Sequence, residues 1–159
     1  MATDILDLVI FRHGEAEGFV TSDDQRQLTE NGRKVTLQQS KALLETGFIP
    51  DVIIHSPFVR TNQTASICHS VFSEADIKSD TLLLHGANPE QVPMTWNNES
   101  SVLLVSHMPL VGRLIQYLCP QSNIYGLPVA GFVRMSLDKN RLQGVISHDG
   151  ASYDRNSHK

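Results

Sequence analysis

Short apolar runs alternate with longer helical segments along this chain, and few folds accommodate such an alternation. The apolar runs are rich in Val, Ile and Leu, and each is followed by a turn signal or a polar cluster, as expected of buried strands. They occupy residues 7–11, 51–55, 81–84 and 101–106. The pattern predicts an α/β fold, a three-layer sandwich in which helices cover both faces of a mainly parallel sheet.

The segments between these runs carry helix signals. Thr29 can cap a helix that runs to about Glu45, because its hydroxyl can accept a hydrogen bond from the first helical turn. The buried side of this helix is expected to carry Leu37, Leu43 and Leu44. The other predicted helices lie at about 60–71, at 89–96, and from Pro109, which suits a first helical turn, to near residue 119.

The end of the chain reads differently from the rest. Two β-like runs, at 131–137 and 142–147, are separated by turn-forming residues and predict a closing β-hairpin. A polar tail follows at about 149–159. Because there is no internal repeat, low-complexity segment or linker, residues 1–159 are expected to form a single domain, a common size for one.

Charge and targeting signals restrict the expected partners. The chain has 17 acidic residues against 13 Lys and Arg, a formal net charge of −4, which argues against binding to nucleic acid or to an anionic membrane. No apolar run approaches the roughly 20 residues that span a bilayer, and the first residues lack the basic start of a signal peptide. Cys68 and Cys119 are expected to be reduced and buried. We therefore expect a cytoplasmic protein.

Three polar clusters follow predicted strands. Arg12 and His13 follow the first strand, the segment from Ser56 to Arg60 follows the second, and His107 follows the fourth. The carboxyl ends of parallel strands meet at one edge of a sheet, so two arginines and two histidines should share one pocket. Such arginines favour phosphate or carboxylate. They would repel a dication, and no acidic or Cys ligand follows at metal spacing, so neither a metal nor a cofactor is expected.

The clusters also resemble a known family. Residues 11–16 (FRHGEA) resemble the Arg-His-Gly signature of the histidine phosphatase superfamily, which includes phosphoglycerate mutases and acid phosphatases. The segment 23–32 resembles the Asp-x-x-Arg-Pro-Leu-Thr-x-x-Gly motif of its SixA branch, the phosphohistidine phosphatases, with Gln27 in place of the proline. Residues 56–65 and 106–111 resemble the second arginine and second histidine motifs, with Met108 where Asn is more usual. The resemblance covers nearly the whole chain and implies a phosphoglycerate mutase-like fold.

The resemblance implies a role for each matching residue. His13 is the implied nucleophile, which attacks as neutral imidazole and becomes phosphohistidine. Arg12, Arg60 and His107 are the implied clamp on the phosphoryl oxygens, and the two arginines also disfavour the protonated form of His13. Gly14 is expected to leave room for the phosphate, because a Cβ there would crowd it.

Two further residues have less certain roles in this reading. Arg26 is a candidate outer contact to the phosphate or to a partner, and Asp23 is a candidate for positioning Arg26. Both could equally be solvated loop residues. The general acid is also open, because the stretch 84–90 lacks the glutamate of the mutase-like members and offers only His85 or Glu90 besides solvent.

The interval 61–106 leaves no room for the lid that larger members insert there, so a minimal, lidless core with an open pocket is expected. An open rim suits a phosphorylated side chain on a folded protein, either a phosphotransfer domain of a signalling relay or a phosphocarrier protein. Two alternatives stay open. One is a phosphomonoesterase or mutase for a small metabolite, and the other is a non-catalytic phosphate-recognition module, against which the presence of His13 argues. The oligomeric state is open as well.

Overall fold

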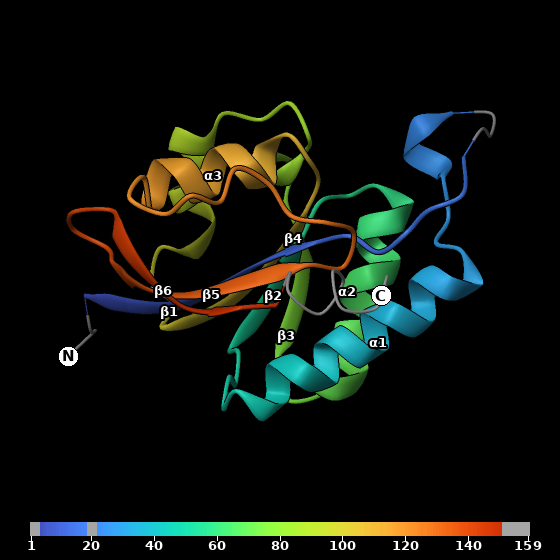
Figure 1. Ribbon diagram of the computed structural model, residues 1–159, viewed down its shortest axis with the longest axis horizontal. Helices are drawn as coiled ribbons and strands as arrows, with labels where there is room; N and C mark the ends of the chain where they lie inside the picture. The colour runs from blue at the N-terminus through green and yellow to red at the C-terminus, as the bar shows by residue number, and fades with distance from the viewer. Residues whose placement is uncertain (1–3, 19–21, 151–159) are drawn as a thin grey trace.

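The computed structural model describes residues 4–18 and 22–150, and this part of the chain forms a six-stranded sheet between two layers of helices (Figure 1). The strand order is β3-β2-β4-β1-β5-β6. The strands are β1 (Ile5–Arg12), β2 (Val52–His55), β3 (Asp76–Ser79), β4 (Ser101–Ser106), β5 (Phe132–Asp138) and β6 (Gln143–Asp149). The first four pair in parallel, whereas β5 runs antiparallel to β1 and forms the predicted hairpin with β6. From residue 151 onward, the expected polar tail lies outside the described residues.

The two faces of the sheet carry separate apolar cores, because successive side chains of a strand point to opposite faces. Leu8 and Ile10 of β1 join the core under α3 (Leu110–Leu118) and the 3-10 helix η3 (Pro89–Trp96). Val9 and Phe11 join the core under α1 (Glu30–Glu45) and α2 (Val59–Val71). The predicted three-layer α/β sandwich is therefore confirmed. None of the described helices is long and apolar enough to cross a membrane.

One strand lies elsewhere than predicted. Residues Thr81–Leu83 form a short 3-10 helix, η2, and the third strand of the chain is β3, at Asp76–Ser79. All four residues of β3 are exposed, so nothing in its side chains resembles a buried strand. As an edge strand it needs only backbone pairing with β2, and a polar sequence satisfies this equally well. Leu83 is buried, but from a helical turn.

The buried side of α1 also differs from the prediction. Leu43 is buried, but Leu37 is half-buried and Leu44 is exposed. The rest of the buried stripe is small or polar, at Gly32, Thr36, Gln39 and Ser40. Its polar groups bond inside the protein: Ser40 Oγ donates to the Thr36 carbonyl at 2.8 Å, and Gln39 Nε2 donates to the Ala130 carbonyl at 3.0 Å. These internal partners make a polar helix face compatible with burial.

The start of α1 is attached to the segment that follows β1. The Thr29 hydroxyl accepts a hydrogen bond from the Gly32 amide at 2.9 Å, as predicted for a cap, and donates to Glu15 Oε1 at 2.6 Å. The Thr29 amide also donates to the Glu15 carbonyl at 3.0 Å. Gly32 permits this close approach, because a Cβ at this position would lie 2.1 Å from the Glu15 carbonyl oxygen.

Replacing Gly32 by Ala should therefore destabilise the protein, although alanine is normally preferred in a helix by about 1 kcal/mol. The Cβ would collide with backbone that cannot move aside alone, and overpacking of this kind costs about 1–3 kcal/mol. Urea unfolding would measure the change. Gly86→Ala is the matched control, because nothing lies within 4 Å of a Cβ built there. A Gly32→Ala protein more stable than the wild type would contradict this account of the junction.

Candidate active site

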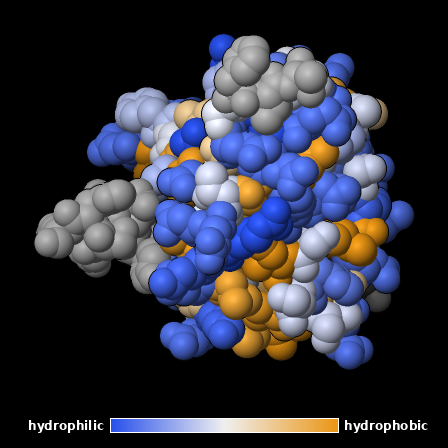
Figure 2. Space-filling view, turned by 90° about the vertical axis from the view of Figure 1, so that its right-hand side faces the viewer, coloured by the Kyte–Doolittle hydropathy of each residue, from blue (hydrophilic) through white to orange (hydrophobic). Residues whose placement is uncertain are grey.

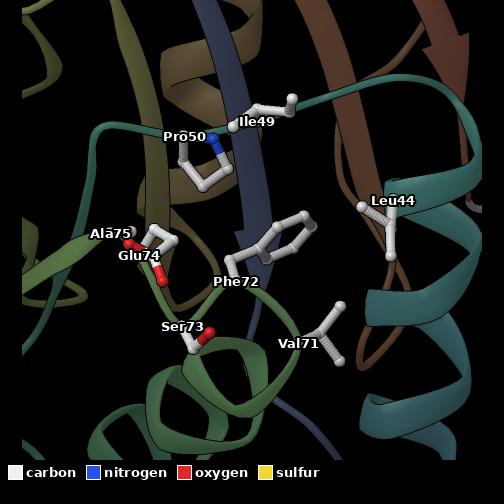
Figure 3. A pocket seen from close by; sticks show the side chains of 8 residues that line it. All are labelled: Leu44, Ile49, Pro50, Val71, Phe72, Ser73, Glu74 and Ala75. Atoms are coloured by element: carbon white, nitrogen blue, oxygen red, sulfur yellow. The ribbon is translucent and has the colours of Figure 1, made fainter.

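One hollow of the surface can be excluded as a site for an anion. Viewed from the side of α1 and α2, the mostly hydrophilic surface has an apolar patch in its lower half (Figure 2). A hollow of about 210 Å³ lies near the segments that precede β2 and β3, at the sheet edge opposite to the predicted pocket (Figure 3). Its lining is Leu44, Ile49, Pro50, Val71, Phe72, Ser73, Glu74 and Ala75. The only charged residue in this lining is acidic, so the hollow offers nothing to hold phosphate.

The predicted clusters meet at the carboxyl ends of β1, β2 and β4. The rings of His13 and His107 have their centroids 5.3 Å apart, and the His13 amide donates to the Ser106 carbonyl at 3.1 Å. Ser56, which follows β2, is tied to β4 through its amide, which donates to the Val105 carbonyl at 3.1 Å. Parallel pairing of the three strands thus brings together side chains that are far apart in the sequence.

The orientation of His13 exposes one ring nitrogen to a ligand. Its Nδ1 lies 2.7 Å from the Gly14 carbonyl oxygen, which can only accept a hydrogen bond. The proton of the neutral ring is therefore on Nδ1, and Nε2 carries the lone pair. Burial lowers the pKa of His13 to about 4, with the charges of Arg60 and Arg12 contributing, against a raising effect of the Gly14 bond. His13 is thus a neutral imidazole with a fixed tautomer and an unprotonated Nε2.

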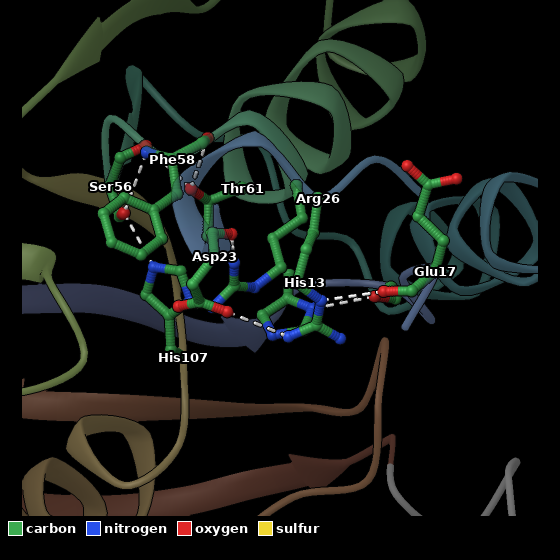
Figure 4. A network of polar contacts seen from close by, with 10 residues as sticks. His13, Glu17, Asp23, Arg26, Ser56, Phe58, Thr61 and His107 are labelled. Carbon is green, nitrogen blue, oxygen red and sulfur yellow. Dashed lines mark hydrogen bonds and ion pairs between the residues drawn. The ribbon is translucent and has the colours of Figure 1, made fainter. Parts of the chain in front are cut away.

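His107 presents a donor to the same space (Figure 4). Its Nε2 lies 2.7 Å from Ser56 Oγ, which itself accepts a hydrogen bond from the Phe58 amide at 3.3 Å. With the Ser56 hydroxyl donating to Nε2, the proton of the neutral His107 ring is on Nδ1, the nitrogen that has no partner among the described residues. Burial, followed by the influence of His13 and Arg60, lowers the pKa of His107 to about 3, so the ring is neutral.

Three buried nitrogens around His13 lack a partner. Arg12 donates through Nη1 to the Leu127 carbonyl at 2.8 Å, and Arg60 donates through Nη1 to the Asp23 carbonyl at 2.8 Å. Their Nε atoms and His107 Nδ1 are the buried side-chain nitrogens that have no hydrogen bond among the described residues. Buried donors are rarely left unpaired without reason. These donors and the charges of the two guanidinium groups favour an anion beside His13.

Asp23 and Arg26 form one wall of the site. They lie on and after the 3-10 helix η1 (Asp23–Gln25). The Asp23 carboxylate contacts Arg26 Nη1 at 3.2 Å, as expected for a positioning role, and also contacts Arg60 Nη2 at 3.3 Å. Burial would raise the pKa of Asp23, but the Arg26 hydrogen bond and the Arg60 charge hold it below its ordinary value. Arg26 is further fixed by donating to the Glu17 carbonyl at 2.7 Å.

The role expected for Gly14 needs correction. A Cβ at Gly14 would meet α1, at 2.4 Å from Thr36 Oγ1 and 2.9 Å from the Gly32 carbonyl oxygen, and not a space for phosphate. The Gly14 amide donates to Thr64 Oγ1 at 3.1 Å, and its carbonyl holds His13. Glycine is therefore required here for the packing of α1 against the backbone that orients the nucleophile.

The sequence reading missed the aromatic side of the site. The Phe58 ring lies 5.1 Å from the His107 ring and 5.1 Å from the Arg60 guanidinium carbon. His85, one of the two acid candidates, lies with its ring 5.8 Å from His107 and 5.6 Å from Phe58. The amide of Glu90 bonds only to the Asn88 side chain that caps η3. The only early signal was the place of Phe58 inside the second polar cluster.

Two absences bear on the chemistry. Among residues 4–18 and 22–150, no group of three or more His, Cys, Asp or Glu residues is placed to hold a metal ion. Between α2 and β4, residues 72–100 are all described and hold only β3, η2 and η3. Residues 72–100 therefore contribute no inserted domain that covers the site.

Comparison with known proteins agrees with this site. The family described as the histidine phosphatase superfamily (branch 1) matches residues 8–83, which include Arg12, His13 and Arg60. Over this stretch the chain is similar to the histidine phosphatase superfamily. It is 28% identical over 160 residues to a phosphohistidine phosphatase SixA homolog of Haemophilus influenzae, with 92% of this chain and 96% of that protein covered. It is 27% identical over 151 residues to phosphohistidine phosphatase SixA of Escherichia coli, with 85% and 88% covered.

The fold of this chain is also that of solved structures. The structure of the protein histidine phosphatase SixA complexed with tungstate superposes with a TM-score of 0.85 at 24% identity, and covers 94% of this chain and 99% of that chain. A phosphoglycerate mutase from Plasmodium falciparum superposes with a TM-score of 0.66 at 17% identity, with 92% and 91% covered. The expected phosphoglycerate mutase-like fold is thus confirmed.

The neutral state of His13 can be measured directly. Burial penalises the charged ring, so the folded protein should keep His13 neutral well below the ordinary histidine pKa of about 6.5, down to a pKa of about 4. Imidazole carbon and proton chemical shifts, assigned with a His13→Gln variant, would follow the titration. The urea-unfolded protein is the control and should titrate at the ordinary value. A folded-state pKa at or above 6.5 would contradict the described environment.

Proposed function

We propose that this protein removes phosphate from phosphohistidine on a partner protein, through a covalent phosphohistidine intermediate on His13. The observation that carries the proposal is a neutral His13, with its Nε2 lone pair free, beside three unpaired nitrogens of Arg12, Arg60 and His107. The names of the Haemophilus influenzae and Escherichia coli relatives support the same substrate class. The partner is a phosphotransfer domain or a phosphocarrier protein, and the site of action is the cytoplasm.

The first step transfers the phosphoryl group to His13. The Nε2 lone pair attacks phosphorus in line, the P–N bond of the substrate breaks, and its electron pair stays on the leaving imidazole, which gains a proton. Arg12, Arg60 and His107 hold the three equatorial oxygens, where negative charge is spread in the transition state. Their donors are already aimed by contacts to Leu127, Asp23 and Ser56, so little reorganisation is required.

The second step returns the enzyme to its starting state. Water attacks phosphorus, the bond from phosphorus to His13 Nε2 breaks, and its electron pair returns to Nε2. The Gly14 carbonyl keeps a proton on Nδ1 throughout, so the phosphorylated ring is cationic and leaves as neutral imidazole. Inorganic phosphate is released, and the attacking water gives up one proton, which balances the proton that the leaving imidazole gained.

The surroundings of the site favour a phosphorylated protein over a metabolite. No inserted domain from residues 72–100 closes over a small substrate. The leaving group of an alkyl phosphate is a strongly basic alkoxide, so its departure needs a placed acid. The leaving group of phosphohistidine is imidazole, a weak base whose conjugate acid has a pKa of about 6.5. In residues 84–90, the only carboxylate is Glu90, whose described contacts lie away from His13.

Replacing His13 by Ala should abolish turnover and leave the fold intact. Incubation with a phosphohistidine protein should give a rapid, acid-labile and alkali-stable phosphate label on the wild type and none on His13→Ala. EDTA should change neither the label nor the rate, because the proposed mechanism uses no metal. His148→Ala, at an exposed histidine of β6, is the matched control and should keep wild-type turnover. More than a few per cent residual turnover in His13→Ala would refute the covalent mechanism.

The catalytic efficiency for each substrate should depend on how readily its leaving group departs from phosphorus. We expect kcat/KM at neutral pH to be highest for a phosphohistidine-bearing carrier domain, lower for p-nitrophenyl phosphate, whose phenolate is stabilised, and lowest for 3-phosphoglycerate. Steady-state kinetics with the three substrates would measure this order. If 3-phosphoglycerate or another alkyl ester matched the phosphohistidine protein, a metabolite phosphatase would replace the proposed function.

A further inference from the structure

The imidazole that leaves must gain a proton, and most titratable groups around His13 cannot supply it. His107 is a neutral imidazole, whose remaining proton serves as a hydrogen-bond donor. Asp23 is an ionised carboxylate between Arg26 and Arg60. The Glu15 carboxylate accepts from the Thr29 hydroxyl, and the Glu17 carboxylate accepts from the Gln27 amide, so both serve the junction of the loops.

The ring of His85 contacts the site and has no described hydrogen bond, whereas His55 Nδ1 lies 2.7 Å from the Ser56 carbonyl oxygen. His85 follows η2, next to the carboxyl edge of the sheet, and its side chain is exposed. Its ring lies edge-on to the rings of Phe58 and His107, which are themselves in contact, so the three rings form a closed triangle. No described residue hydrogen-bonds to the ring nitrogens of His85. The ring is therefore placed by packing, and its nitrogens remain available.

The described contacts of His85 reach the site through His107 and Phe58. In an in-line displacement the nucleophile and the leaving atom are on opposite sides of phosphorus. The described ring contacts run from His13 to His107 and from His107 to His85, while His13 and His85 have no described ring contact with each other. His85 is therefore connected to His13 through His107, and its side chain is exposed.

We propose that His85 is the proton donor to the departing imidazole, and that it protonates the ring nitrogen on the far side from phosphorus. This inference rests on the proposed function and deepens it. As the P–N bond breaks, its electron pair stays on the near nitrogen, the far nitrogen takes the proton of protonated His85, and the partner histidine leaves neutral. His85 regains a proton from the water that hydrolyses phospho-His13, which balances the cycle.

This placement also gives a physical reason for a preference for P–N bonds. In phosphohistidine the proton goes to a nitrogen that points away from phosphorus, toward the rim. In an alkyl ester it must go to the bridging oxygen, which is bonded to phosphorus beside the buried Arg12 and Arg60. An exposed imidazole on the rim can reach the first position but not the second. His85 therefore acts as a catalytic residue that also determines substrate specificity.

Two small probes test the proton transfer without a partner surface. Phosphoimidazole has a far nitrogen that must be protonated, whereas N-phospho-N′-methylimidazolium carries a methyl group there and leaves without a proton. His85→Ala should lower kcat/KM for phosphoimidazole about tenfold or more relative to the methylated probe, since general acids typically contribute 10²–10⁴-fold. His85→Gln should behave as His85→Ala, because an amide can donate a hydrogen bond but cannot give up its proton. Glu90→Gln is the matched control and should leave the ratio at the wild-type value.

The other outcomes are decisive as well. An equal loss on both probes would mean that His85 only supports the Phe58 and His107 rings, and would overturn the proposal. An unchanged rate on both probes, or recovery of the ratio in His85→Gln, would also overturn the proposal. A loss of rate confined to a phosphoprotein substrate would overturn it as well, because His85 would then be a docking contact. A wild-type enzyme that hydrolyses neither probe nor a phosphohistidine protein would instead refute the proposed function. The two failures are therefore distinguishable.

Discussion

The hydrogen bond from His13 Nδ1 to the Gly14 carbonyl determines what the rest of the site can do. It fixes the tautomer of His13 and leaves the lone pair of Nε2 free. It is maintained by packing that starts well outside the site: the Gly14 amide is held by Thr64 of α2, and α1 approaches so closely at Thr36 that no side chain fits at position 14. The nucleophile is thus oriented by the way two helices pack on the sheet.

Charge imposes the second constraint. Two arginines lie beside two neutral histidines, so the empty site has a surplus of positive charge and three buried nitrogens without a partner among the described residues. Asp23 partly compensates for this surplus through its contacts with Arg26 and Arg60. Its carboxylate is half-exposed, and such ion pairs contribute only about 0–1 kcal/mol, so it can yield to a phosphoryl group at little expense. Buried donors without a partner lower stability, and an anion that pairs with them would remove this cost.

Local patterns predicted most elements of the fold. β4 lies where its apolar run predicted it, and the Thr29 cap begins α1 as expected. The predictions of the third strand and of the buried side of α1 failed because an apolar pattern indicates that residues are buried but not which secondary structure buries them. β3 is an exposed edge strand and carries no apolar signal, whereas the apolar 81–84 segment forms a 3-10 turn in which only Leu83 is buried. The polar stripe of α1 is buried because its groups find partners such as the Ala130 carbonyl, on a distant segment that no local pattern can indicate.

The sequence by itself determined the family-like motifs, the alternation of strands and helices, and the convergence of Arg12, His13, Arg60 and His107 at one sheet edge, because parallel strands end on the same side. Only the tertiary structure decided the tautomers of the two histidines, the contact of Asp23 with Arg60, and the packing reason for Gly14. It also distinguished His85 from Glu90, which the sequence had offered as equal candidates for the general acid. Each of these depends on which groups from different elements come within hydrogen-bonding or ring-contact distance, and spacing along one chain does not specify that.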